Sequence, residues 1–131
     1  MVESGTDEGG NHVEVRGRLS TDPAYRELPS GTPIVSFRLV IPRTATVMTR
    51  GSNQRSDWVD CTAWSSAARR RASGWNVGDT VLVVGALRRR HYRAGEVSGS
   101  RVEIEMLGGR IVARGEEPAA RTGRRASAAS G

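Results

Sequence analysis

The chain has 131 residues, a length that suits one domain. Its 20 basic residues, all arginine, outnumber 14 acidic ones and give a net charge of +6, which favours nucleic acid or another polyanion as partner. The single cysteine, Cys61, excludes an internal disulfide framework and a multi-cysteine zinc site, and no apolar run approaches the roughly 20 residues needed to span a bilayer. We therefore expect a soluble, cytoplasmic protein that makes no membrane contact.

Both ends of the chain are predicted to be disordered. Residues 1–10, MVESGTDEGG, are acidic and glycine-rich and lack the basic and apolar segments of a signal peptide. Residues 115–131 are rich in alanine, serine, glycine and arginine without hydrophobic spacing. Residues 11–114 hold 17 arginines against nine acidic residues, a charge of +8. The folded domain that we expect there is thus more basic than the whole chain.

Between the ends, apolar residues alternate with polar ones, as in strands with one buried face. The clearest examples are HVEVRGRL (12–19), VSFRLVI (35–41) and RVEIEM (101–106). Gly17, inside the first of these, predicts a bulge or a sharp bend. The link STDPAYRELPSGTP (20–33) is rich in turn-forming residues, and the polar residues 42–56 predict a long loop.

The only helix that the sequence predicts is SSAARRRASG (65–74). Ser65 or Ser66 can cap its start and Gly74 can close its end. TVLVVGAL (80–87) then supplies another strand. The resulting order, β-β-β-α-β-β, is the one expected of the OB fold, so we predict an all-β, five-stranded OB-fold barrel with one short helix between strands three and four.

The stretch DWVDCTAW (57–64) carries the most informative side chains. If it is extended, one side holds Val59, Cys61 and Ala63, and the other holds Trp58, Asp60, Thr62 and Trp64. The first set is small and apolar, so we predict that it faces the core and that both indoles lie on the open face. Two tryptophans on an open face indicate a flat ligand such as a nucleic-acid base. The alternative is that the indoles cover the mouth of the barrel or contact another subunit.

The other residues that could take part in binding or catalysis are mostly predicted to be structural. Trp75, just after the helix, is predicted to pack in the core, while Tyr25 in the link stays a candidate aromatic. Cys61 is predicted to be a small buried residue rather than a nucleophile. His12 and His91 are too few for a metal set, and the sequence contains no phosphate-cradling glycine loop or serine elbow. We expect no enzymatic activity, no cofactor and no metal.

The run RRRHYRAGE (88–96) continues a hydrophobic strand into four arginines and two rings. On an extended strand one side holds Arg88, Arg90 and Tyr92, and the other holds Arg89 and His91. Two guanidinium groups that lead to a phenol ring suit a track for phosphates and then a base. The alternative is a solvated strand end.

With these residues, the chain resembles the bacterial single-stranded DNA-binding proteins. Four ordered motifs within residues 11–110 carry the resemblance: NHVEVRGRLSTDPAYR, SDWVDCTAW, VGDTVLVVGALRRRHY and EMLGGR. The positions that match the family's stacking aromatics and basic pair are Trp58, Trp64, Tyr92, Arg88 and Arg90. The resemblance implies an OB fold, sequence-independent binding and protection of single-stranded DNA in replication, recombination or repair, and a homotetramer around which the DNA wraps.

On this resemblance, phosphates are expected to follow the arginines of the binding surface. These are Arg16, Arg18, Arg26, Arg43, Arg50, Arg55, Arg88 and Arg90. The loop at residues 43–56 has no aromatic side chain, unlike many family members, so we expect it to hold DNA by charge. The chain ends in GRRASAASG and not in the family's acidic, hydrophobic tip. We therefore expect a tail-less paralogue or a truncated chain, which does not recruit replication or repair enzymes through such a tip.

Two further expectations concern the source and the role of the protein. The all-arginine, alanine- and glycine-rich composition is typical of a GC-rich genome such as an actinobacterium's, and the DNA-binding interpretation implies a cytoplasmic, nucleoid-associated protein. An OB-fold accessory protein, primosome-like and acting mainly through protein contacts, is the main alternative function. An RNA chaperone is a third, although the compact aromatic motifs of the cold-shock family are absent from the sequence.

Overall fold

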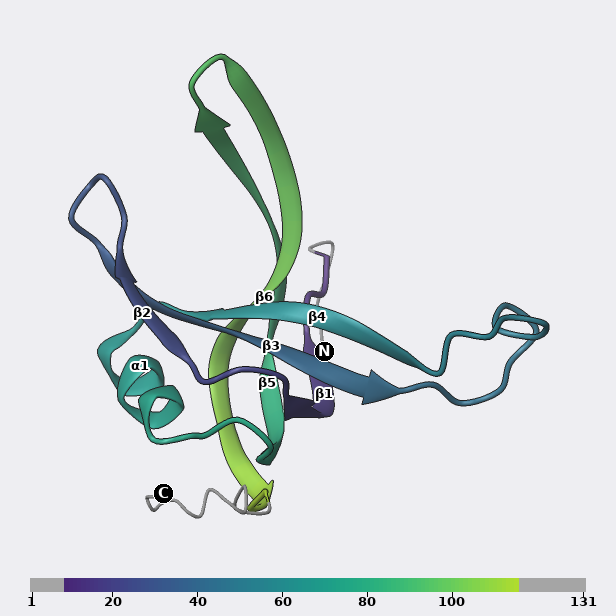
Figure 1. The fold of residues 1–131 in the computed structure, drawn as a ribbon. Helices are drawn as coiled ribbons and strands as arrows, with labels where there is room; N and C mark the ends of the chain where they lie inside the picture. The colour runs from purple at the N-terminus through teal and green to yellow at the C-terminus, as the bar shows by residue number, and fades with distance from the viewer. Residues whose placement is uncertain (1–8, 116–131) are drawn as a thin grey trace.

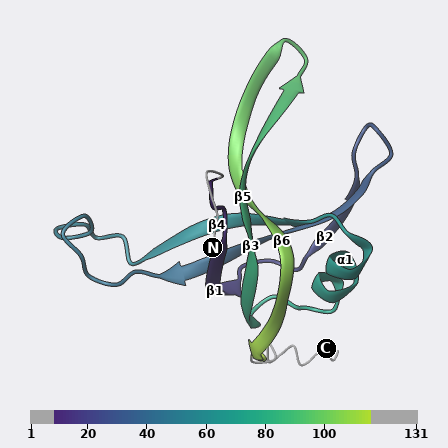
Figure 2. The same ribbon diagram turned by 180° about the vertical axis from the view of Figure 1, so that it is seen from behind.

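The computed structural model describes residues 9–115, so the predicted disordered segments 1–10 and 115–131 lie outside the described residues except for residues 9, 10 and 115. Within that range the elements are, in chain order, β1 (Val13–Leu19), β2 (Ala24–Glu27), β3 (Pro33–Pro42), β4 (Ser56–Ala63), α1 (Ser66–Ser73), β5 (Thr80–Ala94) and β6 (Val97–Ala113). Figures 1 and 2 show their arrangement from two opposite sides. No helix in this part of the chain is long and apolar enough to cross a membrane.

Five of the strands close into a ring. β1 pairs with β5, β5 with β6, β6 with β4, and β4 with β3. The last pairing, β3 with β1, runs through Arg18–Val40 and Leu19–Leu39 and closes the sheet on itself. Because α1 lies between β4 and β5, the third and fourth strands of the ring, the predicted five-stranded OB architecture is confirmed.

The strand β2 was not predicted, because the sequence around it indicates only turns. Ala24–Glu27 pairs with Pro33–Ser36 of β3 in a hairpin whose turn includes Gly31, at a φ of +90°. All four β2 residues are exposed, so they show no alternation of apolar and polar side chains. The pairing therefore depends on β3, and the hairpin projects from the barrel beside α1 (Figure 1).

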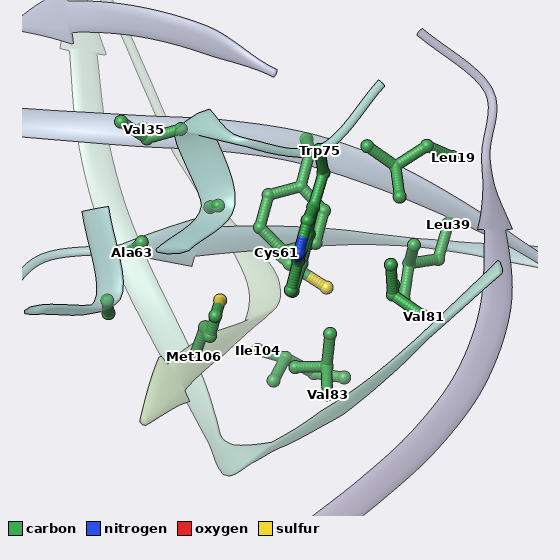
Figure 3. Close-up of a cluster of buried hydrophobic side chains, with 13 residues drawn as sticks. Leu19, Val35, Leu39, Cys61, Ala63, Trp75, Val81, Val83, Ile104 and Met106 are labelled. Carbon is green, nitrogen blue, oxygen red and sulfur yellow. The ribbon is translucent and has the colours of Figure 1, made fainter. Parts of the chain in front are cut away.

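The core confirms the predicted roles of Trp75 and Cys61. Both are buried in a cluster that includes Leu19, Leu39, Val83 and Met106 (Figure 3). Trp75 packs edge-on against Phe37, with ring centroids 5.5 Å apart. Ser65 caps α1 by accepting a hydrogen bond from the Ala68 amide, and Gly74 ends it, so the predicted helix is confirmed as well.

Two glycines allow close approaches between strands. A Cβ on Gly17 would lie 2.8 Å from the carbonyl oxygen of Val40, where β1 crosses β3. The register of β1 with β5 runs through Gly17 without a shift, so of the two predicted alternatives the bulge is wrong, and the sharp bend stays a prediction. Two irregularities lie instead in β5, between Thr80 and Val81 and between Val84 and Gly85. At the second, a Cβ on Gly85 would meet the carbonyl oxygen of Glu105.

Candidate nucleic-acid interface

The outer face of β4 presents the two indoles, as predicted. Trp58 is 59% exposed and Trp64 is half-buried, whereas Cys61 and Ala63, on the inner side, are completely buried. Helix α1 supports this end of the strand, because the guanidinium of Arg69 donates a hydrogen bond to the Trp64 carbonyl oxygen. The assignment of the two faces of β4 is therefore confirmed.

The face is not open along its whole length, which corrects the expectation for Thr62. Its side chain points outward but is only 1% exposed. Strand β6 pairs with β4 at this point, and the Thr62 hydroxyl donates a hydrogen bond to the carboxylate of Glu103 in β6. Only the pairing of the neighbouring strands β4 and β6 brings these two residues together, since 41 positions separate them in the sequence.

The β5–β6 hairpin confirms the predicted alternation in RRRHY. In the pairing of β5 with β6, Arg88 is opposite Glu103, Arg90 is opposite Arg101, and Tyr92 is opposite Gly99. Directly opposed residues share a face of the sheet. Arg89 is on the other side, where its guanidinium donates to the hydroxyl of Ser100.

Arg90 joins the hairpin face to the β4 face. Its guanidinium carbon lies 5.7 Å from the centroid of the Trp64 ring. Tyr92 lies further along the hairpin and packs over Gly99, at which a Cβ would sit 2.7 Å from the phenol oxygen. The predicted aromatics are thus spread over two elements, with Arg90 between Trp64 and Tyr92 along the surface.

A groove of about 330 Å³ lies on this surface, bordered by the β2–β3 hairpin and the β5–β6 hairpin. Its floor includes Phe37 and Thr62. Four arginines line it, and they are Arg26, Arg38, Arg90 and Arg101. A second hollow of about 320 Å³ lies beside it, contains Trp64 and Arg88, and shares Arg90 with the groove. The structure therefore gathers guanidinium groups around the aromatics, as a surface for a polyanion requires.

The remaining predicted arginines lie around this surface rather than in the groove. Arg18 stands opposite Val40, which stands opposite Trp58, so Arg18 shares the outer face of the sheet with that indole. Arg16 is exposed two residues before it. Neither residue lines the groove.

The long loop between β3 and β4 carries the other predicted arginines. Arg43 and Arg55 line a shallow hollow of about 610 Å³ there, and Arg50 is exposed nearby. Arg43 forms a two-point ion pair with Asp57, with an Nη2–Oδ1 distance of 2.8 Å. The hydrogen bond from Arg43 is the main reason why the pKa of the Asp57 carboxyl lies below its ordinary value.

Several residues of this surface were missed by the sequence interpretation. Arg38 and Asp60 form an ion pair across β3 and β4, and Glu103 pairs with Arg90. Arg101 lies over the Tyr92 ring at 5.6 Å. Alternation with core residues indicated that these side chains point outward, but only the strand register shows which side chains they meet. Tyr25, the weaker candidate, is 62% exposed on β2 and does not line the groove.

The chemistry of the surface suits binding. Burial, reinforced by the carboxylates of Asp60 and Glu103, raises the pKa of the Cys61 thiol to about 12, so the thiol stays protonated near neutral pH. Among the described residues, no group of three or more His, Cys, Asp or Glu side chains could hold a metal ion. The observed features are arginines, ion pairs and aromatic rings on a sheet.

Comparison with known proteins identifies the family. A model of the single-strand binding protein family matches residues 10–112, which include every strand except the last residue of β6, Ala113. The chain belongs to the single-strand binding protein family. The family match covers β4 and the β5–β6 hairpin, and so the whole surface described above.

Several curated members of the single-strand binding protein family are similar in sequence. Single-stranded DNA-binding protein A of Bacillus subtilis is 32% identical over 82 residues, which are 63% of this chain and 46% of the relative. Single-stranded DNA-binding protein 2 of Listeria innocua is 30% identical over 94 residues, 72% of this chain and 57% of the relative. The single-stranded DNA-binding protein of Aquifex aeolicus is 33% identical over 94 residues, which are 72% of this chain and 64% of the relative. The matched region spans about half to two thirds of these relatives.

A solved structure shares the fold. The Plasmodium falciparum SSB, solved in complex with ssDNA, superposes with a TM-score of 0.64 at 18% sequence identity and covers 82% of this chain and 96% of that one. At this identity the similarity concerns the fold of the single-strand binding family, which the ring of β1, β3, β4, β5 and β6 reproduces.

Proposed function

We propose that this protein binds single-stranded DNA without sequence preference and is not an enzyme. Bases stack on Trp58, Trp64 and Tyr92, and phosphates lie along the arginines around them. The observation that carries the proposal is the exposed indole of Trp58 on the same face as Trp64, beside a groove lined by four arginines. Each stacked base contributes roughly 1–3 kcal/mol, whatever its identity, because every base has a π-face.

The family supports the choice of nucleic acid over another polyanion. The curated relatives are named for single-stranded DNA binding, and the structural neighbour was solved with ssDNA. We infer that the protein protects single strands in replication, recombination or repair, acts as a homotetramer, and works in the cytoplasm at the nucleoid.

Tryptophan fluorescence during titration with oligo(dT) tests the proposal. We expect quenching, weaker binding at higher salt because neutralised phosphates release counterions, and much weaker binding of a duplex of equal length. Mass in solution, measured on the same sample, tests the tetramer. Emission that does not change, or equal affinity for duplex, would contradict the stacking mechanism.

The same titration separates this function from the alternatives. A protein that captures partners in a pull-down but shows no competition from oligo(dT) would be the accessory, primosome-like protein. Tighter binding of oligo(U) than of oligo(dT) would point to an RNA chaperone.

A further inference from the structure

An arginine lies over the ring of each of the three predicted stacking aromatics. The guanidinium carbon of Arg38 is 4.0 Å from the centroid of Trp58. The corresponding distances are 5.7 Å for Arg90 over Trp64 and 5.6 Å for Arg101 over Tyr92. Distances of up to about 6 Å allow attraction between the cation and the ring quadrupole. Each aromatic therefore has a cation associated with its ring before any ligand binds.

Two of these arginines are in turn held by carboxylates. Nε of Arg38 lies 2.9 Å from Oδ1 of Asp60, and Nη2 lies 3.5 Å from Oδ2, so the two side chains meet at two points. Nε of Arg90 lies 2.5 Å from Oε2 of Glu103. The Glu103 side chain is 5% exposed and also accepts the hydrogen bond from Thr62. Carboxylate, arginine and indole thus form a chain of contacts twice on the same surface.

Carboxylates at these positions disfavour the binding of DNA, so their presence needs another role to explain it. A carboxylate as deeply buried as Glu103 loses hydration that only a close, well-oriented partner offsets. It also repels phosphates near the groove that it helps to line. The same repulsion applies to Asp60, which lines the groove as well. What each provides is a fixed guanidinium, because charge-assisted hydrogen bonds restrict the rotamers of a long side chain. Arg38 is held by two such bonds to Asp60, and Arg90 by one to the buried Glu103.

We propose that Asp60 and Glu103 are positioning residues, which hold Arg38 and Arg90 against one face of Trp58 and Trp64 and so leave the opposite ring face for a base. This inference rests on the proposed function. An arginine whose charge is already neutralised by a carboxylate releases few counterions from DNA. Phosphate contacts then fall to groove arginines such as Arg26 and Arg101, which have no carboxylate partner within the described residues.

The Arg38–Asp60 pair offers the cleaner test because both side chains are partly exposed, so the variants are expected to fold. The variant Arg38→Gln with Asp60→Asn removes the pair without changing the net charge. It is compared with Arg101→Gln, which removes an arginine that has no carboxylate partner in the described part of the chain. Both are made in a Trp64→Phe background, so that Trp58 is the exposed indole and the buried Trp75 gives a constant signal.

The first readout is the dependence of oligo(dT) affinity on salt. For the charge-neutral pair variant we expect a slope of log K against log[salt] equal to that of the parent. For Arg101→Gln the slope should be shallower by about 0.7, the value for one phosphate of a single strand. Asp60→Asn alone should make the slope steeper by about 0.7, since it frees Arg38 for a phosphate. A slope that is about 0.7 shallower in the pair variant would overturn the proposal, since Arg38 would then be an ordinary phosphate contact.

The second readout needs no DNA and separates failure of this inference from failure of the proposed function. Acrylamide quenches an indole by collision, so Asp60→Asn, which leaves Arg38 without its carboxylate, should increase the quenching constant of Trp58 in the free protein. An unchanged constant would show that the ion pair does not position Arg38 on the ring, whether or not DNA binds. If quenching increases but the parent does not bind oligo(dT), the positioning stands and the DNA-binding proposal fails.

Discussion

Replacing Trp58 with alanine tests whether the exposed indole is a stacking platform. Trp58 is 59% exposed and lies outside the buried core cluster, so its loss should change the free energy of unfolding by about 1 kcal/mol at most, mainly through the lost contact with Arg38. Binding should change more. One stacked base contributes roughly 1–3 kcal/mol, which corresponds to an increase in Kd of about 5-fold to 150-fold.

The assay is a titration with a short fluorescein-labelled oligo(dT) followed by anisotropy, with urea unfolding of the same samples. Tyr25→Ala is the matched control, because Tyr25 is a similarly exposed aromatic (62%) that lies on β2, away from the β4 face that carries Trp58. We expect its Kd to stay within about 2-fold of the parent, as for a residue away from the contact. The stacking argument is refuted if Trp58→Ala binds as tightly as the parent, or if Tyr25→Ala loses as much affinity.

Three further predictions concern stability. Gly85→Ala places a Cβ 1.9 Å from a main-chain oxygen of β6, so it should lower the free energy of unfolding in urea by about 3 kcal/mol. Gly108→Ala is the control, because a Cβ there has nothing within 4 Å and the free energy should not fall in this way. Equal losses in the two variants would contradict the close approach. Arg90→Gln leaves the buried Glu103 carboxylate without its arginine and should lower the free energy of unfolding by up to about 3 kcal/mol. The double variant Arg90→Gln with Glu103→Gln should lose less, because no unpaired carboxylate remains. A double variant that is less stable than Arg90→Gln would refute this. Burial raises the pKa of the Cys61 thiol from 9.0 to about 12, so the unfolded chain ionises first and the thiol's contribution, full below pH 9, is lost as pH rises towards 12. Stability against pH should therefore fall less steeply for Cys61→Ala above pH 9, by up to about 1.4 kcal/mol per pH unit, and parallel profiles would show that Cys61 ionises in the folded protein.

The elements with strong local signals could be predicted from the sequence. Alternation placed Cys61 and Ala63 inside and Trp58 outside, because the side-chain period of a strand is two. The helix was predictable because its signals are local: Ser65 and Gly74 form hydrogen bonds with free backbone groups at its two ends. Strand β2 was not, since its four residues are exposed and the buried residues of the pairing, Ile34 and Val35, belong to β3.

The candidate site was predictable only in part, for the same reason. The sequence places Arg88, Arg90 and Tyr92 on one side of a strand, and the structure agrees. The burial of Thr62 beside Glu103 could not be predicted from the sequence, because it requires a contact between residues 41 positions apart.

By itself the sequence determined the strands of the barrel, the buried Trp75, the outward indoles and the basic character of the surface, all of which depend on short-range periodicity and composition. Only the tertiary structure decided which arginine meets which aromatic ring and which carboxylate. Those partners follow from the register between β3 and β4 and between β5 and β6 and, for Arg90 and Trp64, from the pairing of β6 with β4. Register is a property of paired strands, set where the two strands pack, so a side chain such as Arg38 acquires its neighbours Asp60 and Trp58 only when β3 and β4 pair.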